Sequence, residues 1–280
     1  MNPLAIAKEN VVKNARIPAE VIADADAVTA HFADALLAEY TEAKARGRDK
    51  VVFIVPVGPV GQFDVVARRC NENAISLKDL VVINMDEYLT DDGKAFIATD
   101  DALSFRRHMD DHFYNLLDPA LAPPEDQRIF PDPNDIESVA RAIERFGGVD
   151  VCFGGVGITG HVAFNDPPEP NVEMTKEAFA ALPTRVLALS RETLLINSIT
   201  TSRGNVDRIP RYAVTVGMKE ILAARKVRIY MNRFWQSAIV RKILHGPITP
   251  KVPASLLQEH PDVRFVITEE VTEMAEPVLR

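Results

Sequence analysis

Short apolar runs alternate along this chain with longer segments of helical character, and this alternation constrains the fold more than any other feature. Residues 51–55, 80–84 and 149–153 have the length and composition of buried strands, whereas the alanine-rich residues 21–47 carry an apolar stripe typical of a long helix. Strands separated by crossover helices form parallel sheets. The sequence therefore predicts an α/β fold, with a doubly wound, mainly parallel sheet that carries helices on both faces.

The alternation continues to the end of the chain without an intervening linker. We expect further helices at 60–71, 102–117, 135–146, 191–199, 218–225 and 234–245, and further strands at 185–189, 212–216, 227–231 and 263–267. Residues 166–184 contain four prolines and little apolar periodicity, so a loop or lid is predicted there. Residues 1–280 are thus expected to form a single domain.

The bulk composition excludes several classes of partner. The chain has 280 residues and a net charge of -8, which argues against nucleic acid or an anionic membrane as the main ligand. No apolar run approaches the roughly 20 residues of a spanning helix, and the N-terminus lacks the pattern of a signal peptide. Cys70 and Cys152 are the two cysteines, and no His/Cys cluster has zinc-ligand spacing. We expect a cytoplasmic protein with reduced thiols and no metal.

A glycine-rich loop follows the apolar run at 149–153. Residues 154–160 contain four glycines, and His161, Asn165 and Asp166 follow directly. Glycines at the carboxyl end of a strand let the backbone approach a ligand closely, and this edge is where open α/β sheets bind ligands. A purely structural turn would explain the glycines, but it would not explain a histidine and a carboxylate in the same loop.

Polar side chains also follow the two earlier predicted strands. The first ends in Pro56-Val57-Gly58-Pro59-Val60-Gly61-Gln62, and the second in Asn84-Met85-Asp86-Glu87-Tyr88. In a doubly wound sheet these two ends and the glycine loop converge on one crevice. Successive residues of an extended segment point to opposite sides, so one of Asp86 and Glu87 is expected to face it.

A carboxylate and a neutral histidine beside such a loop suit proton transfer next to a carbonyl group. The carboxylate removes a proton from carbon, and the imidazole moves a proton on oxygen. Nucleophilic hydrolysis fits less well, because no Gly-x-Ser-x-Gly motif occurs and neither cysteine has an evident histidine partner. The glycine spacing is also not a dinucleotide fingerprint, since the expected acidic residue on a following strand is absent.

Two motifs in these segments resemble the glucosamine-6-phosphate deaminase/isomerase family. They are Asn84-Met85-Asp86-Glu87-Tyr88 and the segment 154–167, which reads Gly-Gly-Val-Gly-x-x-Gly-His-x-Ala-Phe-Asn-x-Pro, and Tyr212–Gly217 continues the match. The resemblance runs from about residue 20 to 270. It implies an enzyme that opens an amino-sugar ring, isomerises the aldose to a ketose and releases ammonia without any cofactor. The wider superfamily also contains 6-phosphogluconolactonase.

The resemblance assigns roles to three residues. Asp86 matches the base that moves a proton between C2 and C1, and His161 matches the histidine that assists ring opening. Asp166 stands where the family has a glutamate that orients this histidine. Thr159 stands where the family usually has an aspartate, so that carboxylate is absent.

The segment after the first strand departs from the family. The family has Thr/Ser-Gly-Gly-Thr/Ser there, which supplies hydroxyls and amides to the sugar phosphate, whereas this chain has Val57-Gly58-Pro59-Val60. Proline also removes a backbone donor. Gln236 stands in place of the phosphate-binding lysine. We therefore expect a substrate other than glucosamine 6-phosphate.

The remaining candidates are residues expected to border the crevice and to contact a sugar or sugar phosphate. They are Gly58, Gln62, Glu87, Gly155, Gly157, Thr159, Gly160, Arg203, Arg208, Arg233 and Gln236, the three arginines being the cations that could hold an anion from another direction. We expect the chain to form a homo-oligomer. Two alternatives stay open: a catalytically weak sugar-binding or regulatory relative, and, with the least support, a lactone hydrolase.

Overall fold

The central sheet consists of seven parallel strands. The computed structural model describes residues 2–276 of the chain. In spatial order, the strands are β1 (Ala19–Ile22), β10 (Val263–Thr268), β9 (Lys226–Met231), β6 (Val151–Gly155), β2 (Val51–Val55), β3 (Leu80–Asn84) and β5 (Arg128–Ile129). All neighbouring pairs in this sheet are parallel. The predicted doubly wound α/β fold is confirmed, with β2 between β3 and β6.

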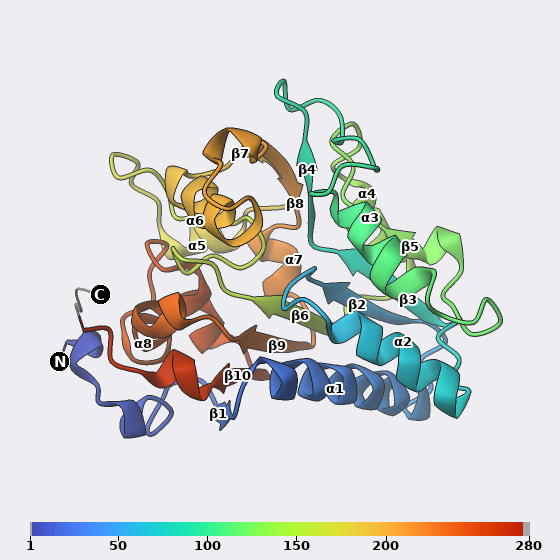
Figure 1. Cartoon of the computed structure of the whole chain (residues 1–280), viewed down its shortest axis with the longest axis horizontal. Coiled ribbons are helices and arrows are strands. Elements are labelled where there is room, and N and C mark those ends of the chain that lie inside the picture. Colours follow the sequence, from blue (N-terminus) through green and yellow to red (C-terminus); the bar gives the residue numbers. More distant parts are fainter. Residues whose placement is uncertain (1, 277–280) are drawn as a thin grey trace.

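Helices cover both faces of this sheet. They are α1 (Ala25–Ala45), α2 (Gln62–Asn73), α3 (Phe105–Met109), α4 (Ser138–Arg145), α5 (Lys176–Ala180), α6 (Arg191–Thr201), α7 (Met218–Leu222) and α8 (Ser237–His245). Figure 1 shows α1 along one side of the sheet with α2 beside it. Side chains of α1 and α2 form one hydrophobic cluster with the sheet, and those of α4, α5, α7 and α8 belong to a second cluster.

The strand β2 shows how the sequence places a core on each face. Its five residues are all buried. Val51, Phe53 and Val55 belong to the cluster under α1 and α2, whereas Val52 and Ile54 belong to the opposite cluster. Because side chains alternate along a strand, a run of five apolar residues is needed when both faces are covered.

A second, smaller sheet was not predicted. It is antiparallel and contains β4 (Asp86–Leu89), β8 (Tyr212–Thr215) and β7 (Arg185–Ala188), in this order. The expectation of one sheet for all strands was therefore wrong for 185–189 and 212–216. These segments are strands, but they pair with β4, the extended segment after Asn84, for which no separate sheet was expected.

Two predicted helices are shorter than expected, for identifiable reasons. The helix predicted from residue 21 begins at Ala25, because the side chain of Asp24 caps it by accepting a hydrogen bond from Ala27 N at 2.9 Å and the preceding residues form β1. The helix predicted at 102–117 starts after Ser104, which caps α3, and continues as a π-helical turn over Asp110–Tyr114.

The predicted lid segment is regular in part. It contains α5, whose first turn is capped by Thr175 and whose Phe179 is buried in the core. The exposed portion is limited to 169–173 and a few later positions. A lid function remains a prediction. Among the helices of residues 2–276, none combines the length and apolar character needed to cross a membrane.

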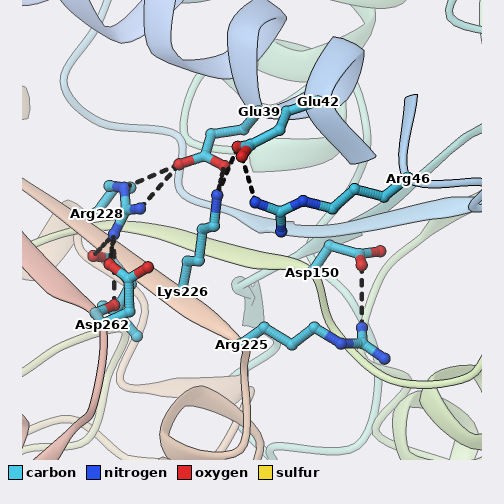
Figure 2. Close-up of polar contacts among 9 residues, drawn as sticks. Glu39, Glu42, Arg46, Asp150, Arg225, Lys226, Arg228 and Asp262 are labelled. Carbon is cyan, nitrogen blue, oxygen red and sulfur yellow. Dashed lines mark hydrogen bonds and ion pairs between the residues drawn. The ribbon is translucent and has the colours of Figure 1, made fainter. Parts of the chain in front are cut away.

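Charged residues at the amino-terminal ends of the central strands are paired with one another, and we call them the amino-edge ion network. Asp150, just before β6, accepts hydrogen bonds from Arg48, Arg225 and the backbone N–H of Val52, with distances of 2.9–3.2 Å to its oxygens. Figure 2 shows the adjoining part, where Glu39 of α1 bonds Lys226 at 2.6 Å and Arg228 at 2.9 Å, and Arg228 also bonds Asp262. Each of these carboxylates has a cationic partner.

Candidate active site

A cavity of about 440 Å³ lies at the carboxyl edge of the central sheet. The chain proceeds from β2 outward through β3 and β5, and later returns through β6, β9 and β10 on the other side. The direction in which strands are added thus reverses between the paired strands β2 and β6. This is the topological switch point of the sheet, where open α/β sheets bind ligands. The cavity is lined by the loops after β2, β6 and β9, together with parts of β4, α3 and α6.

Among the described residues, Asp86 is the only aspartate or glutamate that lines this cavity. Its side chain is 9% exposed, and no residue in the range 2–276 donates a hydrogen bond to its carboxylate. Burial, with a smaller repulsion from Glu87, raises the pKa of Asp86 to about 8. A carboxylate deprived of solvent and partners is a stronger base than an ordinary one.

The neighbouring Glu87 points the other way and is fully buried. Its oxygens accept hydrogen bonds from Ser104 Oγ at 3.1 Å, from the backbone N–H groups of Phe105 and Arg106 at 3.0 and 2.9 Å, and from Arg106 Nε at 3.2 Å. Strand alternation in β4 thus separates the two carboxylates. Glu87 does not line the cavity but anchors the first turn of α3, and its expected contact with substrate remains a prediction.

His161 presents one ring nitrogen to a polar network behind the cavity. Its Nδ1 lies 2.6 Å from Asp166 Oδ1 and 2.9 Å from Thr159 Oγ1. Asp166 also accepts from the hydroxyl of Thr159 at 2.8 Å and from that of Thr193 at 2.9 Å. Burial opposes ionisation of Asp166, but the charge of His161 and these hydrogen bonds outweigh it and hold the pKa of Asp166 well below its usual range.

This network fixes which nitrogen of His161 carries the proton. Because Asp166 is ionised, it only accepts, and each threonine hydroxyl has a single proton that it donates to Asp166. Nδ1 must then supply its own proton to make the 2.6 Å contact with Asp166. In the neutral imidazole, the lone pair therefore lies on Nε2, which is available to accept a proton from a bound hydroxyl.

Gly157 allows the imidazole to occupy this position. A Cβ atom at residue 157 would lie 1.9 Å from His161 Nε2 and 2.2 Å from Cε1. Any other residue would displace the ring. This is the close approach for which the loop needs one of its glycines.

The structure divides the predicted substrate contacts into two groups. Gly58, Gly155, Gly157, Arg233 and Gln236 line the cavity with Asp86 and His161. The amide of Gln236 is nevertheless used internally, because Nε2 donates to Val156 O at 2.7 Å and Oε1 accepts from Arg233 N at 2.8 Å. Its expected contact with a sugar hydroxyl would require breaking these bonds.

The other predicted contacts lie outside the lining. Thr159 and Gly160 are behind His161, and Gln62 is fully buried with its amide donating to Val57 O at 2.9 Å. Arg208 forms an ion pair with Asp101, and Arg203 is an exposed residue in the turn after α6. None of these residues lines the cavity, and a contact between them and a substrate remains a prediction.

One face of α6 supplies site residues that the sequence analysis missed. Thr193 bonds Asp166, Asn197 donates to Tyr88 Oη at 2.9 Å and lines the cavity, and Thr201 also lines it. These residues are spaced four apart, so they share a helix face. A polar stripe of this kind, directly after a Ser N-cap, is the signal that would have found them.

Comparisons with known proteins identify sequence relatives of this chain. No family model matches the sequence. Glucosamine-6-phosphate deaminase of Porphyromonas gingivalis strain W83 is 30% identical over 245 residues, which cover 85% of this chain and 86% of that protein. The enzyme of the same name from Caenorhabditis elegans is 26% identical over 253 residues, which cover 89% and 88% of the two chains.

Solved structures show the same fold. A monomeric glucosamine-6-phosphate deaminase superposes with a TM-score of 0.73 at 23% identity, covering 91% of this chain and 98% of that one. A 6-phosphogluconolactonase from Shewanella baltica gives a TM-score of 0.61 at 16% identity, covering 92% and 98%. The chain thus has the fold of the class of α/β proteins that includes these deaminases and lactonases.

Within this class, the sequence relatives decide the family. The 30% identity extends over most of both chains. The chain belongs to the glucosamine-6-phosphate deaminase family, and the resemblance expected from its two motifs is confirmed.

Proposed function

We propose that this enzyme opens the ring of an amino sugar other than glucosamine 6-phosphate, isomerises the aldose toward the ketose and releases ammonia. The observation that carries the proposal is the pairing in one cavity of two differently prepared groups. Asp86 is a buried carboxyl without hydrogen-bond partners, and His161 is an imidazole oriented by Asp166. Such a pair suits a base at carbon and a proton carrier at oxygen.

Ring opening is assigned to His161. Its Nε2 accepts the proton of the anomeric hydroxyl and returns a proton to the ring oxygen as the C1–O bond breaks, which leaves the free aldehyde. Asp166 stabilises the imidazolium that forms in between, since its carboxylate contacts the opposite ring nitrogen at 2.6 Å. Only His161 changes its charge in this step, because Asp166 stays ionised throughout.

Isomerisation is assigned to Asp86. The carboxylate removes the proton from C2 of the open aldose as O1 gains a proton, which gives the enol, and it then returns its proton to C1. The amino group loses one proton in exchange for the one that O1 gained, which leaves an imine at C2. Water then adds to this imine, which releases ammonia and leaves the ketose. Burial favours the protonated acid, so the raised pKa of Asp86 makes the active carboxylate a strong base at the cost of its population at neutral pH.

The proposal is tested by assaying ammonia release and ketose formation together, on a panel of free and phosphorylated amino sugars. Wild type should produce the two in equal amounts from at least one panel member, and Asp86→Asn should produce neither while still binding it. Release of ammonia without a ketose would contradict the isomerisation. Binding without turnover in the wild type would favour the alternative of a sugar-binding relative, to which the altered loop after β2 points.

A further inference from the structure

The wall that the loop after β2 presents to the cavity is apolar. Pro56, Val57, Gly58, Pro59 and Val60 all line the cavity, and none has a side-chain hydrogen-bond donor. Pro59 also lacks a backbone N–H. This loop leads into α2, whose N-cap Gly61 supplies no side-chain hydrogen bond.

The groups packed beside this loop do not add positive charge to it. Asp64 lies in the first turn of α2 and bonds His112 Nδ1 at 3.0 Å, and His112 stacks on His108 with ring centroids 4.4 Å apart. His108 lines the cavity, and burial together with His112 lowers its pKa, so it is a neutral imidazole at neutral pH. The positive end of the α2 dipole already faces the carboxylate of Asp64.

The remaining lining contains one permanent cation among the described residues, which is Arg233. It follows β9 and is exposed, so solvent weakens its attraction for an anion. The walls contributed by β4, α3 and the loop after β6 include Tyr88, Phe105 and Phe164, whose rings pack together with centroids 4.9–6.2 Å apart. The cavity thus offers hydrocarbon and aromatic surface away from its two catalytic groups.

We propose that the substrate is an amino aldose whose end remote from C1 and C2 is uncharged and apolar, such as a 6-deoxy-2-aminohexose. This inference rests on the proposed function for the reacting end of the sugar. A methyl group against Val57, Pro59 and Val60 leaves water favourably, whereas a phosphate dianion would lose its hydration without finding donors.

Turnover gives the first test. We compare 2-amino-2,6-dideoxyglucose, glucosamine and glucosamine 6-phosphate, and measure kcat/KM for ammonia release. The deoxy sugar should exceed the phosphorylated one by at least about tenfold, because the phosphate loses charge-assisted hydrogen bonds in this wall. A preference of the same size for glucosamine 6-phosphate would overturn the inference while supporting the proposed function.

Binding of unreactive analogues separates the two proposals. In the hexitols of the same three sugars, the C1 aldehyde is reduced to an alcohol. They lack the carbonyl group that reacts, so their affinities do not depend on catalysis. By calorimetry, the 6-deoxy hexitol should bind at least about tenfold more tightly than the 6-phosphate. If no sugar is turned over but this order of affinities holds, the proposed function fails and the inference about the wall stands. If the phosphate binds most tightly, the wall has been misassigned.

Variants of the loop complete the test. Val57→Thr and Val60→Thr each add a hydroxyl and leave the side-chain volume nearly unchanged. Each should shift the ratio of 6-deoxy to 6-phosphate affinity toward the phosphate by about threefold or more. Val206→Thr, at a partly exposed position outside the cavity lining, is the matched control and should leave the ratio unchanged. An unchanged ratio in both loop variants would show that this wall does not contact the far end of the substrate.

Discussion

The two edges of the central sheet treat buried carboxylates in opposite ways. At the amino edge, Asp150 is 7% exposed and accepts hydrogen bonds from Arg48, Arg225 and a backbone N–H. The other carboxylates of the amino-edge ion network are paired in the same way. At the carboxyl edge, Asp86 is 9% exposed and has no such donor among the described residues. Similar burial with opposite pairing fits the proposal that one carboxylate serves the fold and that the other serves the reaction at some expense in stability.

The same substitution at the two edges should sharpen this comparison most. Asp86→Asn should lower kcat/KM by roughly 10²-fold or more, because general-base catalysis is lost. It should also raise the free energy of unfolding by about 1–3 kcal/mol at pH 7, because the wild-type carboxyl must take up a proton when the chain folds, whereas the amide is neutral in both states. Steady-state kinetics and denaturant unfolding measure the two effects. A variant that is both inactive and less stable would show that Asp86 is structural.

Asp150→Asn is the counterpart at the other edge. We expect the free energy of unfolding to fall by about 1–3 kcal/mol, since Arg48 and Arg225 lose their charged partner but remain partly exposed to solvent. Below the unfolding transition, kcat/KM should stay within about twofold of wild type, because no step assigned to the cavity uses this edge. A large loss of activity in the folded variant would break the distinction between the edges.

The pH dependence tests the state of Asp86 directly. As the active form is the carboxylate, kcat/KM should rise about tenfold per pH unit below the pKa of Asp86 and level off above about 8. The stability difference between Asp86→Asn and wild type gives a check without substrate. In the wild type, the unfolded chain ionises near pH 4 and the native state only near 8, so the advantage of the variant should grow between these values and then stay constant. A difference that is flat with pH would contradict the raised pKa.

A smaller effect is expected behind His161. Thr193→Val removes one hydroxyl from Asp166 and should lower kcat by roughly three- to tenfold with little change in KM, because the imidazole is less firmly oriented. Thr193→Ser should restore kcat. Thr200→Val, at an exposed position of α6 where the hydroxyl bonds only backbone carbonyls, is the matched control. A change in KM alone would assign Thr193 to substrate binding instead.

The sequence predicted the central strands well because their signal is local. β2 and β3 have the bounds expected from their apolar runs, and all five residues of each strand are buried. β1 was missed because four residues with a mixed burial pattern precede the helix without a break. β4 was missed as a strand because its first two residues are charged and it follows β3 almost directly. It forms a strand only by pairing with β8, more than a hundred residues later in the chain.

The site residues were likewise predicted only where their signal is local. Two short motifs, each contained in one segment, led to Asp86, His161 and Asp166. The structure places the first two in one cavity, with Asp166 behind the histidine. Their catalytic roles remain predictions. Gln62 and Glu87 lie buried outside the cavity lining, and this could not be predicted, because sequence does not show where a polar side chain near a site forms its hydrogen bonds.

The anchoring of α3 by Glu87 has a consequence for how such an enzyme diversifies. Asp86 and Glu87 are consecutive, so the strand that carries the proposed base also holds two residues of the cavity lining. Glu87 accepts hydrogen bonds from Ser104 and Phe105. The loop after β2 is not part of this unit and contributes its own side of the cavity. If this loop contacts the far end of the substrate, as we propose, replacements in it would change that contact while Asp86 stays where β4 holds it.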